Sequence, residues 1–354
     1  MKKFLIKIAI AFLPVIFMWG GLYLYYYSEV YPNQSGDIGS LGKIPFGKDY
    51  ESEFSKEFPG YMVCITDTSK ALMQDSSIHV GIIGDSFSHR GNTGFVNFTG
   101  KYLNEKVAFF DWDWPNPNYD PTLTLIGLLN SDYFKGTSIN TLVLSVVERN
   151  FVPNILGADL NYSKNNLRFH HGDNNGKKHS ENNKKKKKVN EKSLQEARNY
   201  LLLRFGYKSR IGKEKLSKDL FTLRPHDLFY YSYDTNRQTI TKQEQKTIKE
   251  KLLALRGLAE SKGIRLLILM PVDKYDLYEP YIVGKKHPKI ETCEIVRTLA
   301  DTSYLILAKP YLREMLAKGE KDVFLANDTH WSYKAADVMG KVLAEKIKER
   351  ARLR

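Results

Sequence analysis

The stretch HVGIIGDSFSHRG, residues His79–Gly91, decides the fold. Its first half, His79–Gly84, is a short and almost wholly apolar run, and a helical pattern follows over Phe95–Leu103. A strand that is buried on both faces of a parallel sheet has a continuous apolar run of this kind. The stretch therefore predicts a central strand that ends in a tight turn, with Ser86 just beyond its carboxyl end.

Three further apolar runs of strand length follow, and segments with helical patterns separate them. The runs are Val107–Phe110, Thr141–Val147 and Ile264–Met270, and helical patterns at Leu123–Leu129 and Thr241–Ser261 precede the last two. Strands that alternate with helices in this way form a parallel sheet with helices on both faces. The predicted fold class is therefore α/β and doubly wound.

The alternation fails between Phe151 and Asn236, which we interpret as an insertion (151–236) over one end of the sheet. A helical pattern at Leu194–Phe205 lies within it. Its Lys-rich stretch, residues 164–192, has ten Lys or Arg against three Asp or Glu, a net charge of +7 out of the formal +14 of the chain. Such a run predicts a solvated, flexible loop. Because few aromatic residues accompany the lysines and no nucleic-acid module is recognisable, we expect no nucleic-acid binding.

The uncharged apolar run Ile8–Tyr26 is long enough to cross a bilayer as a helix. Three lysines precede it and the next basic residue is Lys43, so the positive-inside rule places the N-terminus in the cytoplasm. A cleaved signal peptide is the alternative, although no small-x-small cleavage site follows. We predict a single-pass protein of the inner or plasma membrane, with its folded part periplasmic or extracellular. Its parts are a cytoplasmic N-terminus and anchor (1–27), a linker and lead-in (28–76) and an α/β domain (77–354).

A second motif, NDTHWS at Asn327–Ser332, precedes a helical pattern near the end of the chain. A serine hydroxyl is a poor nucleophile until a base takes its proton, and the usual base is a histidine held by a carboxylate. Asp328 and His330 offer that pair, and Ser332 is placed to cap the final helix. Each motif alone is common in turns. Together they predict a triad of Ser86, His330 and Asp328.

Gly-Asp-Ser after the first core strand and Asp-x-His before the last helix is an order that resembles SGNH hydrolases. Asn-Asp-Thr-His-Trp-Ser is similar to the signature of their polysaccharide O-acetyltransferase branch, which includes the alginate O-acetylation proteins of the AlgJ and AlgX types. The resemblance consists of short motifs across roughly residues 78–348. It implies a flavodoxin-like core, with Ser86, His330 and Asp328 as the triad.

The same resemblance implies acetyl transfer to a cell-surface or exported polysaccharide through an acetyl-serine. No metal or other cofactor is expected, and acetyl-CoA is confined to the cytoplasm. A multispanning membrane O-acyltransferase is therefore the implied partner that supplies the acetyl group. An esterase that acts on an acylated glycan or lipid, a non-catalytic glycan-binding assembly subunit, and an acyl group other than acetyl, such as D-alanyl, remain open alternatives.

The oxyanion donors depart from the usual pattern of the superfamily, because the third strand ends without a Gly-x-Asn sequence. Arg149 or Asn150 is positioned to donate from that strand end, and an ion pair between Glu148 and Arg149 is the alternative. Asn118 lies where the glycine of the superfamily would fall. Trp331 is a candidate for substrate binding, although an aromatic residue is more often part of a core.

Other polar residues have two interpretations each. His89 either lines the pocket or faces solvent in the turn. Cys64 and Cys293 either form a disulfide or are two small buried side chains. Metal binding by the insertion histidines His170, His171 and His179 is not expected, because no carboxylate or cysteine completes a ligand set.

Overall fold

The computed structural model describes residues 2–47, 50, 58–65, 75–110, 119–131, 133–163, 191–205, 210–235, 239–284, 288–301 and 303–351. Asn118, the three insertion histidines and residues 164–190 of the Lys-rich stretch lie outside these ranges.

A six-stranded sheet in which every neighbouring pair is parallel forms the centre of the molecule. Its order is β1-β3-β2-β4-β7-β8. Without the edge strand β1, the remaining five strands follow the chain order 2-1-3-4-5, which is the flavodoxin-like arrangement. The predicted doubly wound α/β fold is confirmed. The bounds of the strands are β1 (Met62–Ile65), β2 (Val80–Gly84), β3 (Val107–Phe110), β4 (Thr141–Ser145), β7 (Arg265–Met270) and β8 (Leu305–Leu307).

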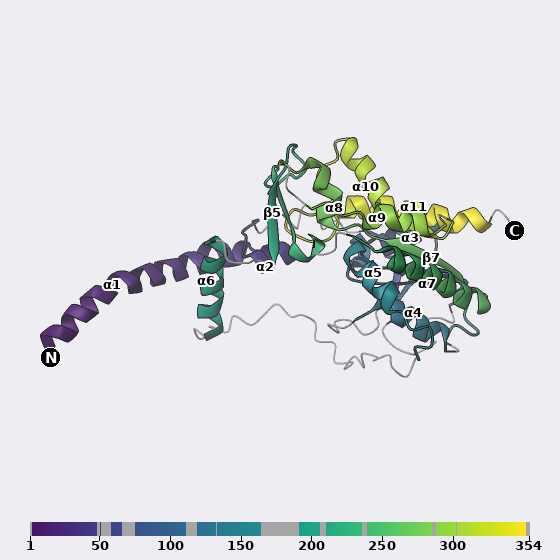
Figure 1. Cartoon of the computed structure of the whole chain (residues 1–354), viewed down its shortest axis with the longest axis horizontal. Helices are drawn as coiled ribbons and strands as arrows, with labels where there is room; N and C mark the ends of the chain where they lie inside the picture. Colours follow the sequence, from purple (N-terminus) through teal and green to yellow (C-terminus); the bar gives the residue numbers. More distant parts are fainter. Residues whose placement is uncertain are drawn as a thin grey trace.

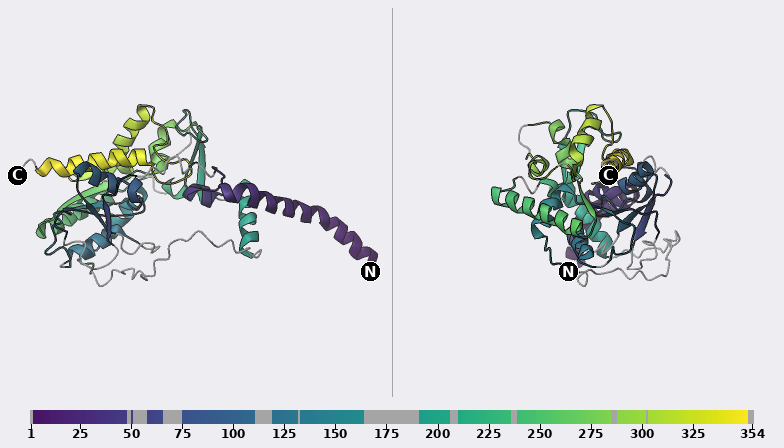
Figure 2. Two further views of the ribbon diagram at one scale, coloured as in Figure 1. Left: turned by 180° about the vertical axis from the view of Figure 1, so that it is seen from behind. Right: turned by 90° about the vertical axis from the view of Figure 1, so that its right-hand side faces the viewer.

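Two layers of helices cover the sheet (Figures 1 and 2). On one side α3 packs against α11, which also contacts α10, and on the other side α4, α5 and α7 contact one another. Every residue of β2, β3 and β4 is buried between these layers, which explains their unbroken apolar runs. The helices are α3 (Phe95–Leu103), α4 (Pro121–Leu129), α5 (Glu148–Gly157), α7 (Lys242–Ser261), α9 (Thr292–Leu299), α10 (Ala308–Ala317) and α11 (Tyr333–Ala351).

Helix α7 shows how the sequence forms one of these covering elements. Thr241 and Glu244 make a capping box at its start, so two backbone N–H groups of the first turn are satisfied by side chains. Its buried residues recur every three or four positions and form one apolar stripe that faces the sheet. They are Ile248, Leu252, Leu255 and Ala259.

Helix α5 takes up the first residues of the predicted insertion, 151–157, and belongs to the layer that covers the sheet. Farther along, the described part of the insertion forms α6 (Glu191–Arg204) and a small antiparallel pair, β5 (Ile211–Lys215) and β6 (Asp227–Tyr231). This pair contacts α2 (Gly36–Gly42) of the lead-in, and β6 also contacts α8 (Lys274–Tyr278). The 3-10 turns η6 (Ser232–Thr235) and η7 (Glu279–Tyr281) lie beside it, while η4 (Gly91–Thr93) precedes α3. The insertion therefore brings the end of β6 close to Ser86, at the carboxyl end of β2.

The N-terminal helix α1 (Lys2–Tyr25) projects away from the folded body, and the C-terminus lies at the opposite end (Figures 1 and 2). Helix α1 continues into a π-helical turn, η1 (Tyr26–Val30), and a 3-10 turn, η2 (Tyr31–Asn33). The segment from Ile6 to Asn33 contains an 18-residue window with a mean hydropathy of 1.9, and no residue of that window is buried. The segment is long and apolar enough to cross a membrane.

Cys293 of α9 is a buried, free thiol, so the disulfide alternative is not the one that the structure shows.

Candidate active site

The turn that carries Ser86 directly follows the central strand β2, and hydrogen bonds to Asp85 hold this turn in place. Its Oδ1 accepts a hydrogen bond from the Phe87 amide at 3.0 Å, and its Oδ2 accepts one from the Val147 amide at 2.6 Å. Burial raises the pKa of the Asp85 carboxyl, while these two amides and the charge of Arg149 oppose the rise. Asp85 therefore ties the turn after β2 to the end of β4 and leaves half-buried Ser86 at the surface of the site.

Gly84 is required by close packing at this turn. A Cβ at this position would lie 2.1 Å from Ser88 Oγ and 2.8 Å from Ser145 Cβ. Any larger residue would push the turn away from β4, and Ser86 with it. The carbonyl of Gly84 accepts a hydrogen bond from the Tyr119 hydroxyl at 2.9 Å, which holds the strand end from a further side.

The three side chains of the predicted triad lie together although Ser86 and His330 are 244 residues apart in the chain. Ser86 Oγ is 2.8 Å from His330 Nε2, and His330 Nδ1 is 2.7 Å from Asp328 Oδ1. The same Asp328 oxygen accepts a hydrogen bond from the backbone amide of His330 at 3.0 Å. With Nδ1 protonated and held by Asp328, Nε2 is the basic nitrogen that faces the serine hydroxyl.

Asp328 stays ionised although it is almost fully buried. Burial disfavours its charge, but the hydrogen bond and charge of His330, with the charge of Arg90, outweigh that cost and hold its pKa well below the usual range. Arg90 is 3.4 Å from Asp328 Oδ2. The carboxylate is thus available to stabilise a positive charge on His330 during proton transfer.

Lys274 supports the loop of residues 325–332 before α11, the catalytic loop, which carries Asp328 and His330. It is fully buried at the start of α8, and its Nζ donates to the carbonyls of Leu325 at 2.7 Å, Ala326 at 3.1 Å and Asp328 at 3.1 Å. Burial lowers its pKa to about 7, against the attraction of nearby carboxylates. Ser332 was expected to support this loop as a helix cap, but its Oγ has no hydrogen-bond partner among the described residues. Lys274 makes that contribution instead.

The lead-in helix α2 docks onto the same loop. The amides of Ile38 and Gly39 donate to the carbonyl of Asn327 at 3.0 and 3.1 Å, and Asn327 Nδ2 donates to Ser35 Oγ at 2.7 Å. Gly36 has a φ of +68°, and a Cβ there would lie 2.3 Å from the Asn327 carbonyl oxygen. The chain segment that follows the apolar helix therefore packs directly against the catalytic histidine loop.

Asp37 of α2 adds a second carboxylate beside the triad. Its Oδ2 accepts a hydrogen bond from Thr329 Oγ1 at 3.1 Å and lies 3.5 Å from His330 Nδ1. Donor atoms of Asp37, Asp328 and His330 lie within 4.8 Å of one another, a spacing that a cation can use. Both ring nitrogens of His330 already have partners in Ser86 and Asp328.

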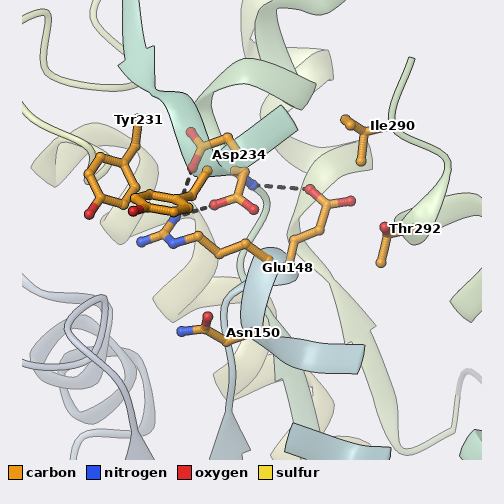
Figure 3. Close-up of a pocket in the computed structure, with 9 residues that line it drawn as sticks. Glu148, Asn150, Tyr231, Asp234, Ile290 and Thr292 are labelled. Carbon is orange, nitrogen blue, oxygen red and sulfur yellow. Dashed lines mark hydrogen bonds and ion pairs between the residues drawn. The ribbon is translucent and has the colours of Figure 1, made fainter. Parts of the chain in front are cut away.

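The triad opens into a cavity of about 540 Å³. A second cavity of about 400 Å³ adjoins it (Figure 3), and Arg149 and Tyr231 line both. The catalytic cavity is lined by Asp37, Leu41, Ser86, His89, Arg90, Arg149, Tyr231, Thr329 and His330. His89 was expected either to line the pocket or to face solvent. The residue is exposed and lies on the wall of this cavity.

Arg149 reaches the site but is held by carboxylates. Its guanidinium contacts Asp273, lies 3.5 Å from Asp234, and sits 6.0 Å from the centre of the Tyr231 ring. Burial opposes its charge, yet Asp273 and Asp234 raise its pKa above the ordinary value. The alternative of an ion pair with Glu148 is wrong, because Glu148 instead accepts a hydrogen bond from the Asp273 amide at 3.1 Å.

The other substrate-binding candidates have different positions. Asn150 lines the second cavity but not the catalytic one. Trp331 is only 2% exposed and packs edge-on against Phe87 and Phe95, with ring centres 5.1 and 5.9 Å apart. It forms core beneath the loop, so the predicted role in substrate binding has to be corrected.

Sequence reasoning missed four residues of the site: Asp37, Arg90, Lys274 and Tyr231. No local pattern marks Asp37 or Lys274, because each acts on a loop distant in sequence. Arg90 lies four residues after Ser86 in the quoted stretch, which was the available signal.

A parallel sheet of flavodoxin-like order, a serine after its first core strand and a His–Asp pair before its last helix form an arrangement that resembles that of SGNH hydrolases. Residues 224–354 match the family model described as "SGNH hydrolase-like domain, acetyltransferase AlgX", which confirms the resemblance to the AlgX-like branch. The matched part contains Asp328 and His330, whereas Ser86 joins the site through the geometry described above. Searches of curated proteins and of solved structures each found no match.

Proposed function

We propose that this protein is a membrane-anchored O-acetyltransferase that modifies a cell-surface or exported polysaccharide through an acetyl-Ser86 intermediate. One observation carries the proposal. Ser86 Oγ lies 2.8 Å from His330 Nε2, while Asp328 holds the other ring nitrogen at 2.7 Å. The match of residues 224–354 to an acetyltransferase family supports the choice of acyl group.

In the first half-reaction His330 Nε2 takes the proton of Ser86 Oγ as the oxygen attacks the carbonyl carbon of the acetyl donor. The Ser86 backbone N–H is our candidate donor to the resulting oxyanion. When the bond to the leaving alcohol breaks, His330 returns the proton to that alcohol and acetyl-Ser86 remains. Asp328 stabilises the imidazolium throughout.

In the second half-reaction a sugar hydroxyl attacks acetyl-Ser86. His330 takes the proton of that hydroxyl, the Ser86 Oγ–acyl bond breaks, and the proton returns to Oγ. The sugar leaves as an acetyl ester and the enzyme is regenerated. These steps use only protons and an acyl group, so the proposal includes no metal and no other cofactor.

The proposed topology places the three N-terminal lysines in the cytoplasm and the catalytic body outside. Because acetyl-CoA remains on the cytoplasmic side, a multispanning membrane O-acyltransferase is the proposed supplier of acetyl groups. Helix α2 lies close to the apolar helix in the chain, docks on the catalytic loop and contributes Asp37 and Leu41 to the cavity wall. This arrangement favours a site that opens near the membrane surface, where such a partner can deliver its acyl group.

Full-length protein in detergent, incubated with an activated acetyl ester and candidate oligosaccharides, tests this proposal. We expect acetylated sugar from the wild type and none from Ser86→Ala. Release of free acetate alone would show an esterase. If Ser86→Ala restores glycan O-acetylation in a deletion strain, the protein is a non-catalytic assembly subunit.

A further inference from the structure

A second cavity lies beside the catalytic one, and the proposed mechanism does not use it. It is lined by the end of β6, η6, the start of α5 and residues near α8 and α9, namely Glu148, Arg149, Asn150, Tyr231, Tyr233, Asp234, Asp273, Ile290 and Thr292 (Figure 3). Its volume of about 400 Å³ is in the range of small-molecule sites. Since Arg149 and Tyr231 also line the catalytic cavity, a ligand here would extend towards Ser86.

We propose that this second cavity is a sugar-binding subsite that holds an uncharged ring of the glycan substrate beside Ser86. The inference deepens the proposed function, because it names the class of sugar and the residues that would bind it. Three separate properties of the cavity support it: its aromatic wall, its unsatisfied buried oxygen and the state of its cation.

The aromatic wall consists of Tyr231 and Tyr233, whose ring centres are 5.0 Å apart at an interplanar angle of 46°. Tyr233 is 49% exposed, so part of its ring is open to a ligand. Aromatic rings offer an apolar face to the C–H groups of a sugar and a hydroxyl at the edge. The two tyrosines thus form a platform at the mouth of the cavity.

Buried oxygen atoms supply the polar contacts. Asp234 is only 4% exposed, and its Oδ2 has no hydrogen-bond partner among the described residues, whereas its Oδ1 faces Arg149. Glu148 Oε1 receives no donor from a neutral or cationic group in the described part of the chain, but the Glu148 side chain is hydrogen-bonded to the Asp276 carboxyl, so Asp234 carries this observation. Buried polar atoms normally have partners, so those that lack them indicate a ligand that carries hydrogen-bond donors. Sugar hydroxyl groups are such donors, and the side-chain amide of Asn150 can add a further contact.

The cation of this cavity is already neutralised. Among the described lining residues the only cation is Arg149, and its guanidinium contacts Asp273 and lies 3.5 Å from Asp234. A uronate carboxylate would find no uncommitted positive charge and would face three carboxyl groups, those of Glu148, Asp234 and Asp273. A neutral sugar ring meets no such penalty.

Direct binding tests the subsite without depending on turnover. Full-length protein with the Ser86→Ala substitution is titrated with a neutral oligosaccharide, and binding is followed by NMR. The oligosaccharide is one that the wild type accepts as acceptor, or else the neutral member of a panel that binds most tightly. Adding Tyr233→Ala is expected to raise its Kd about tenfold or more, and adding Asp234→Asn to raise it several-fold. A matched tyrosine, Tyr311, is 39% exposed on α10 outside both cavities, and Tyr311→Ala should leave the Kd unchanged.

A transfer assay then separates this inference from the proposed function. The expected result is a raised KM for the acceptor in Tyr233→Ala, with rates normalised to ester cleavage measured without acceptor. An unchanged Kd and KM in Tyr233→Ala, or tighter binding of a uronate oligosaccharide than of any neutral one, would overturn the subsite. If the wild type binds the neutral sugar through Tyr233 but only hydrolyses acetyl esters, the subsite stands and the transferase proposal fails.

Discussion

At the residue scale, the proposed mechanism gives Asp328 two roles: it orients His330 through Nδ1, and it stabilises the imidazolium that forms when Ser86 is deprotonated. An asparagine keeps the size of the side chain but lacks the charge and allows the wrong histidine tautomer. We expect Asp328→Asn to slow acetyl-ester cleavage by about 10⁴-fold. Stopped-flow measurement of ester cleavage checks this, with thermal unfolding as the test of folding.

Asp37→Asn is the matched comparison, since Asp37 lies farther from His330, at 3.5 Å, and is largely exposed. Its effect should be below about tenfold, as is usual for an exposed charge. Equal losses in the two variants would show that Asp328 has no special place in the triad.

Lys274 makes the stability of the protein depend on pH. Burial lowers its pKa to about 7, whereas in the unfolded chain it is near 10.4. Between these values the unfolded state binds a proton that the folded state does not, so the free energy of unfolding rises with pH. Lys274→Met removes this contribution and also leaves three carbonyls without their donor.

Denaturant titrations at pH 7 and pH 9 measure the effect. The stability difference between wild type and Lys274→Met should be larger at pH 9, by up to about 1.4 kcal/mol per pH unit. A difference that is the same at both values would mean that Lys274 keeps its proton in the folded protein.

At the residue scale, only the site residues that belong to short sequence motifs could be predicted. Ser86, Asp328 and His330 stand in two such motifs, and the structure brings them together. Lys274 was not predictable, because a lysine at a helix start says nothing about carbonyls more than fifty positions away. Trp331 was misjudged because its place in the motif does not reveal which way its ring faces.

At the scale of elements, the docking of α2 on the catalytic loop makes a sharp prediction about Gly36. Its φ of +68° is unfavourable for other residues, and a Cβ would collide with the Asn327 carbonyl oxygen at 2.3 Å. Gly36→Ala should therefore cost about 1–3 kcal/mol and lower the rate of ester cleavage, because the loop carrying His330 has to move.

Gly257→Ala in α7 is the control. A Cβ there meets nothing within 4 Å, and alanine favours a helix, so this variant should gain up to about 1 kcal/mol and keep full activity. If Gly36→Ala is as stable and active as the wild type, α2 does not position the loop.

The elements themselves were predicted in proportion to the length of their patterns. The four apolar runs correspond to β2, β3, β4 and β7, and α3 has the predicted bounds of Phe95–Leu103. The edge strands β1 and β8 were missed for different reasons: β8 has only three residues, whereas β1 is as long as β3 but is mostly half-buried, so it does not stand out as a buried run. The lead-in was predicted to be irregular, yet α2 forms there because it packs against β5, β6 and the catalytic loop.

On the scale of the whole molecule, an apolar helix projects from one end of the folded body (Figure 1). If this helix is embedded in the bilayer as an anchor, the protein should stay with membranes after washing with alkaline carbonate and high salt, and it should leave them in detergent. Immunoblots of the fractions check this. Release by carbonate would contradict a membrane-spanning anchor, and a mature protein that lacks the first 27 residues would favour the cleaved signal peptide.

The two distant motifs meet only because the chain passes through the whole sheet between them: β2 leads to Ser86 at the centre, and the loop before α11 returns His330 to the same edge. If this meeting is catalytic, Ser86 itself must carry the acyl group during turnover. The direct measurement is mass spectrometry of the peptide containing Ser86 after a rapid quench of full-length protein with an activated acetyl ester. The account predicts an added acetyl group on Ser86 in the wild type and almost none in His330→Ala. Turnover of the ester with no acetyl group on Ser86, or with the label on another residue, would contradict it.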